Sequence, residues 1–157
     1  MAHAPAALSS DLCWLLARAS HGLTTELTAA LEEVGVSPRA HSVLATAMTG
    51  ELTQTEIARA VGLDKTTMVV TVDELEAAGL AERRPSSSDR RARVIFVTEA
   101  GEQAAREAEK VLDRVRDDVL SSLDPDERQV FLNALATLAC GRLAEPVPCA
   151  HPVRRRA

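Results

Sequence analysis

The chain has 157 residues, enough for one ordinary domain, and 46% of them are hydrophobic, which excludes a disordered protein. Its 18 basic and 23 acidic residues give a net charge of −5, which argues against indiscriminate nucleic-acid binding by the whole surface but not against a local basic site. Aromatic residues make up 2% and tyrosine is absent, which disfavours readout of RNA or single strands by base stacking.

The N-terminal third predicts two helices. From Leu8 to about Val34, leucine and alanine recur at three- and four-residue steps, and Gly35 ends this helix. Ser37-Pro38 then provides an N-cap with proline at the first helical position, opening a helix that runs through Met48 and is terminated by Gly50. The chain shows no secretory signal pattern and no apolar run of about 20 residues, and its three cysteines have no close pairing, so we expect a cytoplasmic protein with no membrane contact.

A helix-turn-helix follows. Thr53-Gln-Thr-Glu56 forms a capping box, in which the threonine hydroxyl and the glutamate carboxylate each accept a free backbone N–H. The short helix that starts there is closed by Gly62, which adopts left-handed geometry without penalty. Asp64 caps a second helix that should run to Ala78, with Gly79 as its stop.

The second of these helices has two distinct sides. On a wheel of about 100° per residue, the buried side carries Met68, Val72 and Leu75. The side expected to face solvent carries threonines around a β-branched valine, namely Thr66, Thr67, Val70 and Thr71. Threonine hydroxyls bond base edges or phosphates and methyl groups pack on the thymine C5-methyl, so this side suits the major groove of DNA. The alternative is an amphipathic surface helix whose valine is incidental.

A basic β-hairpin comes next. Leu80 to Arg84 and Arg93 to Val97 are predicted strands, joined by a turn at 85–88. Five arginines crowd the hairpin, with Asp89 as the single acid among them: Arg83, Arg84, Arg90, Arg91 and Arg93. An arginine at a hairpin tip suits a narrow minor groove, and its neighbours can hold phosphates. Helix and hairpin together predict a winged helix-turn-helix.

Two further helices complete the prediction. Thr98 caps a long helix to about Ser121, and Asp124-Pro125 starts the last one. The first and last helices carry more apolar surface than one small lobe covers, so we expect them to interlock with a partner subunit; an intramolecular bundle is the alternative. The expected domains are an N-terminal dimerisation helix at 1–36, the DNA-binding lobe at 37–98, C-terminal linker and dimerisation helices at 99–144, and a disordered tail at 145–157.

Three stretches carry a family resemblance. Asp64-Lys-Thr-Thr-Met-Val-Val-Thr-Val-Asp-Glu-Leu-Glu-Ala-Ala-Gly-Leu80, Ser88-Asp-Arg-Arg-Ala92 and Val97-Thr-Glu-Ala-Gly101 resemble the MarR family of bacterial transcriptional regulators. The resemblance implies a mainly α winged helix-turn-helix fold and a homodimer on pseudo-palindromic double-stranded DNA. It also implies a repressor released by a small molecule or by oxidation, with Arg91 at the wing tip. Val70 stands where relatives often have arginine or another polar base reader, so the operator sequence cannot be carried over.

The effector is a separate question. The segment Ser10 to Ser20 resembles the organic-hydroperoxide-sensing branch of the family, whose reactive cysteine occupies the Cys13 position. A helix N-terminus favours the thiolate, which is the form that peroxide oxidises. That branch holds its thiol with tyrosines, which are absent here, so Trp14 and either His21 or His41 are the candidate substitutes. The alternative is that Cys13 is a small apolar filler.

Other functions remain open at this point. The family more generally implies a small aromatic effector between the dimer core and the DNA-binding lobe. The four histidines have no recognised metal spacing within one segment, although a metal-responsive regulator with a site between helices is an alternative. A winged-helix protein-interaction module that does not bind DNA is another. We expect no catalytic residues, no cofactor and no enzyme activity, because the sequence lacks a nucleophile, base and oxyanion arrangement.

Overall fold

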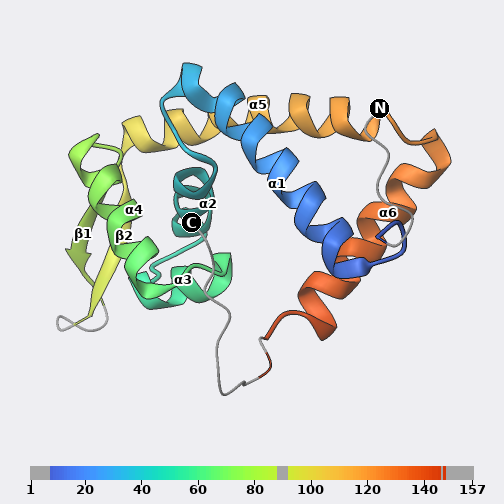
Figure 1. The fold of residues 1–157 in the computed structure, drawn as a ribbon. Coiled ribbons are helices and arrows are strands. Elements are labelled where there is room, and N and C mark those ends of the chain that lie inside the picture. The colour runs from blue at the N-terminus through green and yellow to red at the C-terminus, as the bar shows by residue number, and fades with distance from the viewer. Residues whose placement is uncertain (1–7, 88–91, 146, 148–157) are drawn as a thin grey trace. The chain divides into compact units, whose positions relative to one another are not determined.

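The computed structural model describes residues 8–87, 92–145 and 147. Figure 1 shows the elements in chain order, which are α1 (Leu12–Leu31), the 3₁₀ helix η1 (Glu32–Val34), α2 (Pro38–Ala47), α3 (Gln54–Val61), α4 (Lys65–Ala77), β1 (Ala81–Pro85), β2 (Arg93–Val97), α5 (Glu99–Leu120), α6 (Pro125–Thr137) and the π-helix η2 (Leu138–Arg142). The chain divides into two compact units, Met1–Val115 and Arg116–Ala157. The mainly α fold with a two-stranded wing is as predicted. None of the described helices is long and apolar enough to cross a membrane.

The predicted caps of the helix-turn-helix are present. Glu56 N–H donates to Thr53 Oγ1 at 3.3 Å and Thr53 N–H donates to Glu56 Oε2 at 2.7 Å, which completes the capping box at the start of α3. Gly62 ends α3 with φ of 71°. Asp64 Oδ1 accepts the N–H of Thr67 at 2.9 Å and so fixes the first turn of α4. These caps set where α4 begins relative to α3.

Two predicted boundaries are corrected. The first helix begins at Leu12 rather than Leu8, because the side chain of Asp11 caps it by accepting the N–H of Trp14 at 2.7 Å. The first strand covers Ala81–Pro85 rather than starting at Leu80. Leu80 instead donates its N–H to the carbonyl of Leu75 at 2.9 Å and so belongs to the end of α4.

The core of the winged-helix lobe lies between α2, α3, α4, the hairpin and the start of α5. Its fully buried members include Val43, Leu44, Ile57, Met68 and Val72. The strands pair antiparallel, from Ala81 opposite Val97 to Pro85 opposite Arg93. The segment before α3 also pairs with β2, which the sequence did not indicate. Thr53 forms an isolated bridge with Val94, and Ile95 N–H donates to Leu52 O at 3.1 Å.

The start of α5 is hydrogen-bonded to the end of α4. Thr98 Oγ1 donates to the carbonyl of Gly79 at 2.8 Å and accepts the N–H of Gly101 at 3.0 Å, which confirms Thr98 as the cap. A Cβ placed on Gly101 would lie 1.9 Å from the carbonyl oxygen of Leu80, so only glycine permits this approach of helix to loop. A second small cluster of Leu31, Ala108 and Val111 joins α1 to α5.

The outer helices leave apolar side chains uncovered in the single chain. In α1 only Leu31 is buried, while Leu12, Leu15 and Leu23 are exposed. The second unit contains α6, none of whose described residues is buried, and it exposes Val130, Phe131, Leu138 and Leu143. Exposed apolar surfaces of this kind are typical of sites where another molecule binds.

Candidate nucleic-acid interface

The exposed side of α4 is the first component of the site. Lys65 and Thr66 in the first turn are exposed. One turn later, Val69 and Val70 are 37% and 47% exposed, although both are β-branched apolar residues. The structure therefore leaves Thr66 and Val70, two of the predicted base readers, open to a partner and adds Val69 and Lys65, which the sequence analysis did not select.

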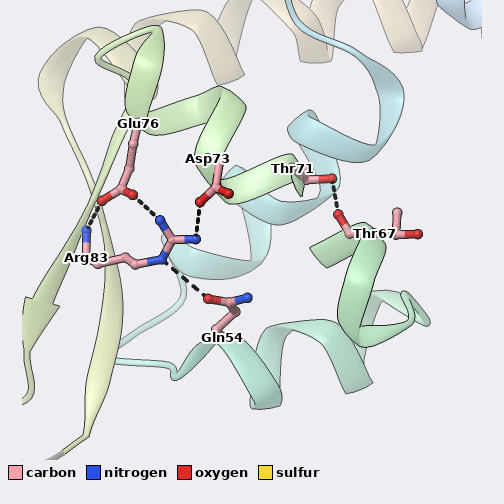
Figure 2. A network of polar contacts seen from close by, with 6 residues as sticks. All are labelled: Gln54, Thr67, Thr71, Asp73, Glu76 and Arg83. Atoms are coloured by element: carbon pink, nitrogen blue, oxygen red, sulfur yellow. Dashed lines mark hydrogen bonds and ion pairs between the residues drawn. The ribbon is translucent and has the colours of Figure 1, made fainter. Parts of the chain in front are cut away.

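The other two predicted base readers lie elsewhere. Thr71 is 0% exposed, so its predicted place on the solvent side is wrong. It shares a face with Met68 and Leu75, three and four residues away, and its hydroxyl is satisfied by donating to the carbonyl of Thr67 at 2.8 Å (Figure 2). Thr67 is half-buried, and its own hydroxyl donates to Asp64 Oδ2 at 2.7 Å as part of the helix cap.

A groove between α3 and α4 is the second component. Its volume is about 740 Å³, and it is lined by Thr53, Gln54, Thr55, Ala58, Arg59, Leu63, Lys65, Met68, Val69 and Arg93. Arg93, predicted as a DNA contact, joins Arg59 and Lys65 here, and all three are exposed. The sequence analysis missed Arg59 and Lys65, which line one groove only because of how α3 packs against α4. Three cations around one open groove create a local positive field that suits phosphates.

Arg83 connects the wing to α4. Its backbone N–H donates to Glu76 Oε1 at 2.8 Å, and its guanidinium pairs with Glu76 Oε2 and, at 2.7 Å, with Asp73 Oδ1. Figure 2 shows the guanidinium between these carboxylates, with Gln54 of α3 accepting from Nε at 3.4 Å. Only 26% of the side chain is exposed. Two carboxylates thus hold the guanidinium of Arg83, which joins β1 of the wing to α4.

The remaining wing arginines differ in their surroundings. Arg84 is exposed, lies 3.5 Å from the centroid of the Phe96 ring, and pairs with Glu82 at 2.9 Å. Its stacked guanidinium therefore lies on the outer surface of the strands. Arg90 and Arg91, the predicted tip residues, lie outside the described residues.

Glu51 holds the turn end of the wing. Its Oε2 accepts three hydrogen bonds, from Ser87 Oγ at 2.8 Å, from Ser87 N–H at 3.1 Å and from Ser86 Oγ at 3.2 Å. The bonds from Ser87, followed by the bond from Ser86, lower the pKa of Glu51 from its ordinary value of 4.5, because they stabilise the carboxylate. Glu51 thereby joins the segment before α3 to the two residues that follow β1.

The candidate effector residues are dispersed. Cys13 is exposed in the first turn of α1, beside the half-buried Trp14, and His21 is exposed further along the same helix. His41 is buried in α2, where its Nε2 lies 3.0 Å from Glu109 Oε2 on α5. Their described polar contacts do not bring these residues into one site. No group of three or more potential metal ligands occurs among the residues that the structure describes.

Comparison with known proteins explains this geometry. Residues 34–92 match the sequence model of the MarR family. The transcriptional repressor CouR, in a structure with a 23-mer DNA duplex, is 30% identical over 88% of this chain and 99% of its own, with a TM-score of 0.80. The chain belongs to the MarR family.

Two further MarR-type structures agree with this assignment. CouR from Rhodococcus jostii RHA1, bound to p-coumaroyl-CoA, is 30% identical over 86% of this chain and 96% of its own, with a TM-score of 0.75. A MarR-family regulator from Rhodococcus sp. RHA1 is 28% identical over 86% of this chain and 98% of its own, with a TM-score of 0.77. This MarR-family protein is therefore a DNA-binding transcriptional regulator, which confirms the expectation that it is not an enzyme.

The network around Arg83 generates a prediction that separates positioning from DNA contact. In Arg83→Gln, we expect the free energy of unfolding to fall by about 1 to 3 kcal/mol, because charge-assisted bonds to Asp73 and Glu76 are lost. DNA affinity should fall as the wing moves, while the slope of log affinity against log salt stays unchanged. The matched control is Arg93→Gln, which should keep its stability and reduce that slope by about one. Denaturant melts and salt titrations by fluorescence anisotropy provide the two readouts. A stable Arg83→Gln protein with a reduced slope would show direct phosphate contact instead.

The Glu51 contacts predict a local pH response. Because the folded-state pKa lies below 4.5, the bonds from Ser87 are fully present above that pH and are lost as the pH falls through the lowered pKa. The amide resonance of Ser87, followed by NMR from pH 6 downward, should therefore titrate with a midpoint below 4.5. Glu51→Gln should abolish this step. A midpoint at or above the ordinary glutamate value would contradict the assignment.

Proposed function

We propose that this protein is a homodimeric repressor that binds pseudo-palindromic double-stranded DNA and leaves it when an effector binds. One observation carries the proposal: the open side of α4, with Thr66, Val69 and Val70, adjoins a groove edged by three cations and lies in the same lobe as the basic wing. The likeness to CouR, a repressor with a DNA-bound structure, supports it.

The exposed side of α4 and the cations beside it suit duplex DNA. An α-helix fits the major groove, and the α4 side described above is free of core contacts. Arg59, Lys65 and Arg93 would bind the phosphates along that groove. We assign the minor groove to the wing tip, with Arg91 as the inserted side chain and Arg90 beside it, on the basis of the family resemblance. Arg84 is left as a peripheral phosphate contact.

The uncovered helices support a second copy of the chain as partner. Exposed leucines on α1 and the exposed apolar residues of α6 would be buried by interlocking with their counterparts. Two lobes held in this way can present both copies of α4 to half-sites about one DNA turn apart. An effector that changes their separation would weaken binding to both half-sites at once.

For the effector we favour a small aromatic compound or its acyl-CoA. The relative CouR has been crystallised with p-coumaroyl-CoA, which has this chemistry. His41, held by Glu109, joins α2 of the DNA-binding lobe to α5 and is therefore suited to transmit a change between them. Oxidation of Cys13 is the second candidate, since the thiol is exposed in the first turn of α1. A metal effector is the third.

The test is a fluorescence anisotropy titration with a duplex from immediately upstream of this protein's own gene. The wild type should bind tightly, with an affinity that falls steeply with salt. Arg91→Ala should bind this duplex far more weakly and lose most of the preference over random DNA. A winged-helix interaction module would show neither effect, so equal weak binding by both proteins contradicts the proposal.

The effector is tested by adding candidate compounds to the same protein–DNA complex. Adding p-coumaroyl-CoA tests the aromatic class, an organic hydroperoxide tests thiol oxidation, and zinc tests a metal response. Release by hydroperoxide in the wild type but not in Cys13→Ser would identify a thiol sensor. Release by the aromatic thioester in both proteins would identify a ligand sensor and leave Cys13 a packing role. A complex that resists all three compounds would contradict the effector part of the proposal.

A further inference from the structure

The open side of α4 changes its chemistry along the helix. The first turn offers hydrogen-bond donors, the ammonium of Lys65 and the hydroxyl of Thr66. The next turn offers only methyl groups, from Val69 and Val70. After them comes Asp73, whose carboxylate is held at 2.7 Å by the guanidinium of Arg83. The centre of the helix therefore presents an apolar surface patch, Val69 and Val70, between two polar ones.

We infer that Val69 and Val70 select thymine in each half-site by packing on its C5-methyl group. This inference rests on the proposed function, because it requires α4 to lie in the major groove. It adds a base preference, which neither the fold nor the family assignment supplies, and it names Val69 as a reader beside Val70.

Each base pair displays its own set of groups in the major groove. Every base presents a donor or an acceptor there, thymine its O4, and a valine packed over such a group would leave it without a partner. Thymine alone presents a methyl group. Because valine is stiff about χ1, its methyl groups are fixed in place when the helix docks, and little rotamer entropy is lost. Thymine is therefore the base that best fits against Val69 and Val70 of α4.

The neighbouring side chains reinforce the selection. Thr66 lies one turn before Val70 on the same side of the helix, so its hydroxyl can bond an adjacent base or phosphate and fix the register. The guanidinium of Arg83 holds Oδ1 of Asp73 and partly neutralises this acid, which weakens it as an acceptor for cytosine. The described middle of α4 also carries no arginine or lysine that could bond guanine. An A·T pair is thus preferred over G·C at these positions.

The experiment begins with selection of binding sites from a random duplex library by the full-length protein. The enriched sequence should contain two symmetric half-sites with a thymine at matching positions. Each such thymine is then replaced by deoxyuridine, which removes the methyl group and keeps base pairing. For the wild type, each replacement should lower the affinity about fourfold, the value expected for one buried methyl group.

Valine variants complete the test as a double-mutant cycle. Val69→Ala or Val70→Ala should weaken binding to the thymine duplex and abolish the thymine-to-uracil difference at the base that it contacts. Both residues are exposed and alanine favours helix, so the variants should fold, which circular dichroism verifies. Val70→Thr, which retains one methyl group, should keep part of the difference.

The outcomes separate the two proposals. Equal affinity of the wild type for thymine and uracil duplexes, or an undiminished difference in both alanine variants, overturns the thymine inference and leaves the DNA-binding proposal standing. A selection that enriches no sequence overturns the DNA-binding proposal and this inference with it.

Discussion

The position of the wing depends on one partly buried ion-pair network, in which Arg83 of the wing lies between Asp73 and Glu76 of α4. Helix α4 and strand β1 are consecutive in the chain, and the backbone bond from Leu80 N–H to Leu75 O joins them. The guanidinium of Arg83 adds a side-chain clamp, since it pairs with two carboxylates of α4 and donates to the amide oxygen of Gln54. Under the proposed function α4 and the wing contact adjacent grooves, which requires a constant angle between them.

A second set of contacts ties this lobe to the rest of the chain. Thr98 bonds the carbonyl of Gly79 and caps α5, and Gly101 lets that helix approach the backbone of Leu80. Glu51 joins the other end of the wing to the segment before α3. The wing is therefore held at both of its ends by side chains from outside the hairpin. A displacement of α5 would act on the end of α4 through these contacts, and we propose this as the route from an effector to α4.

The local features of this fold were predictable from the sequence. Capping boxes, a helix-stop glycine and turn residues act within four or five residues, so Thr53, Gly62, Asp64 and Thr98 identify their elements without tertiary information. The face of Thr71 was not predicted, because a threonine that bonds its own helix carbonyl can be buried like a valine. The intramolecular partners of Arg83 were also not predicted, since Asp73 and Gln54 lie 10 and 29 positions away in the sequence.

The central claim is that two copies of this lobe present α4 and the wing to successive grooves on one side of the DNA. Hydroxyl-radical footprinting of the selected duplex tests this claim most directly. We predict two symmetric sets of protected sugars about one helical turn apart, each flanked by protection from the wing across the minor groove. A single protected segment without symmetry, or protection that ignores the grooves, would contradict it.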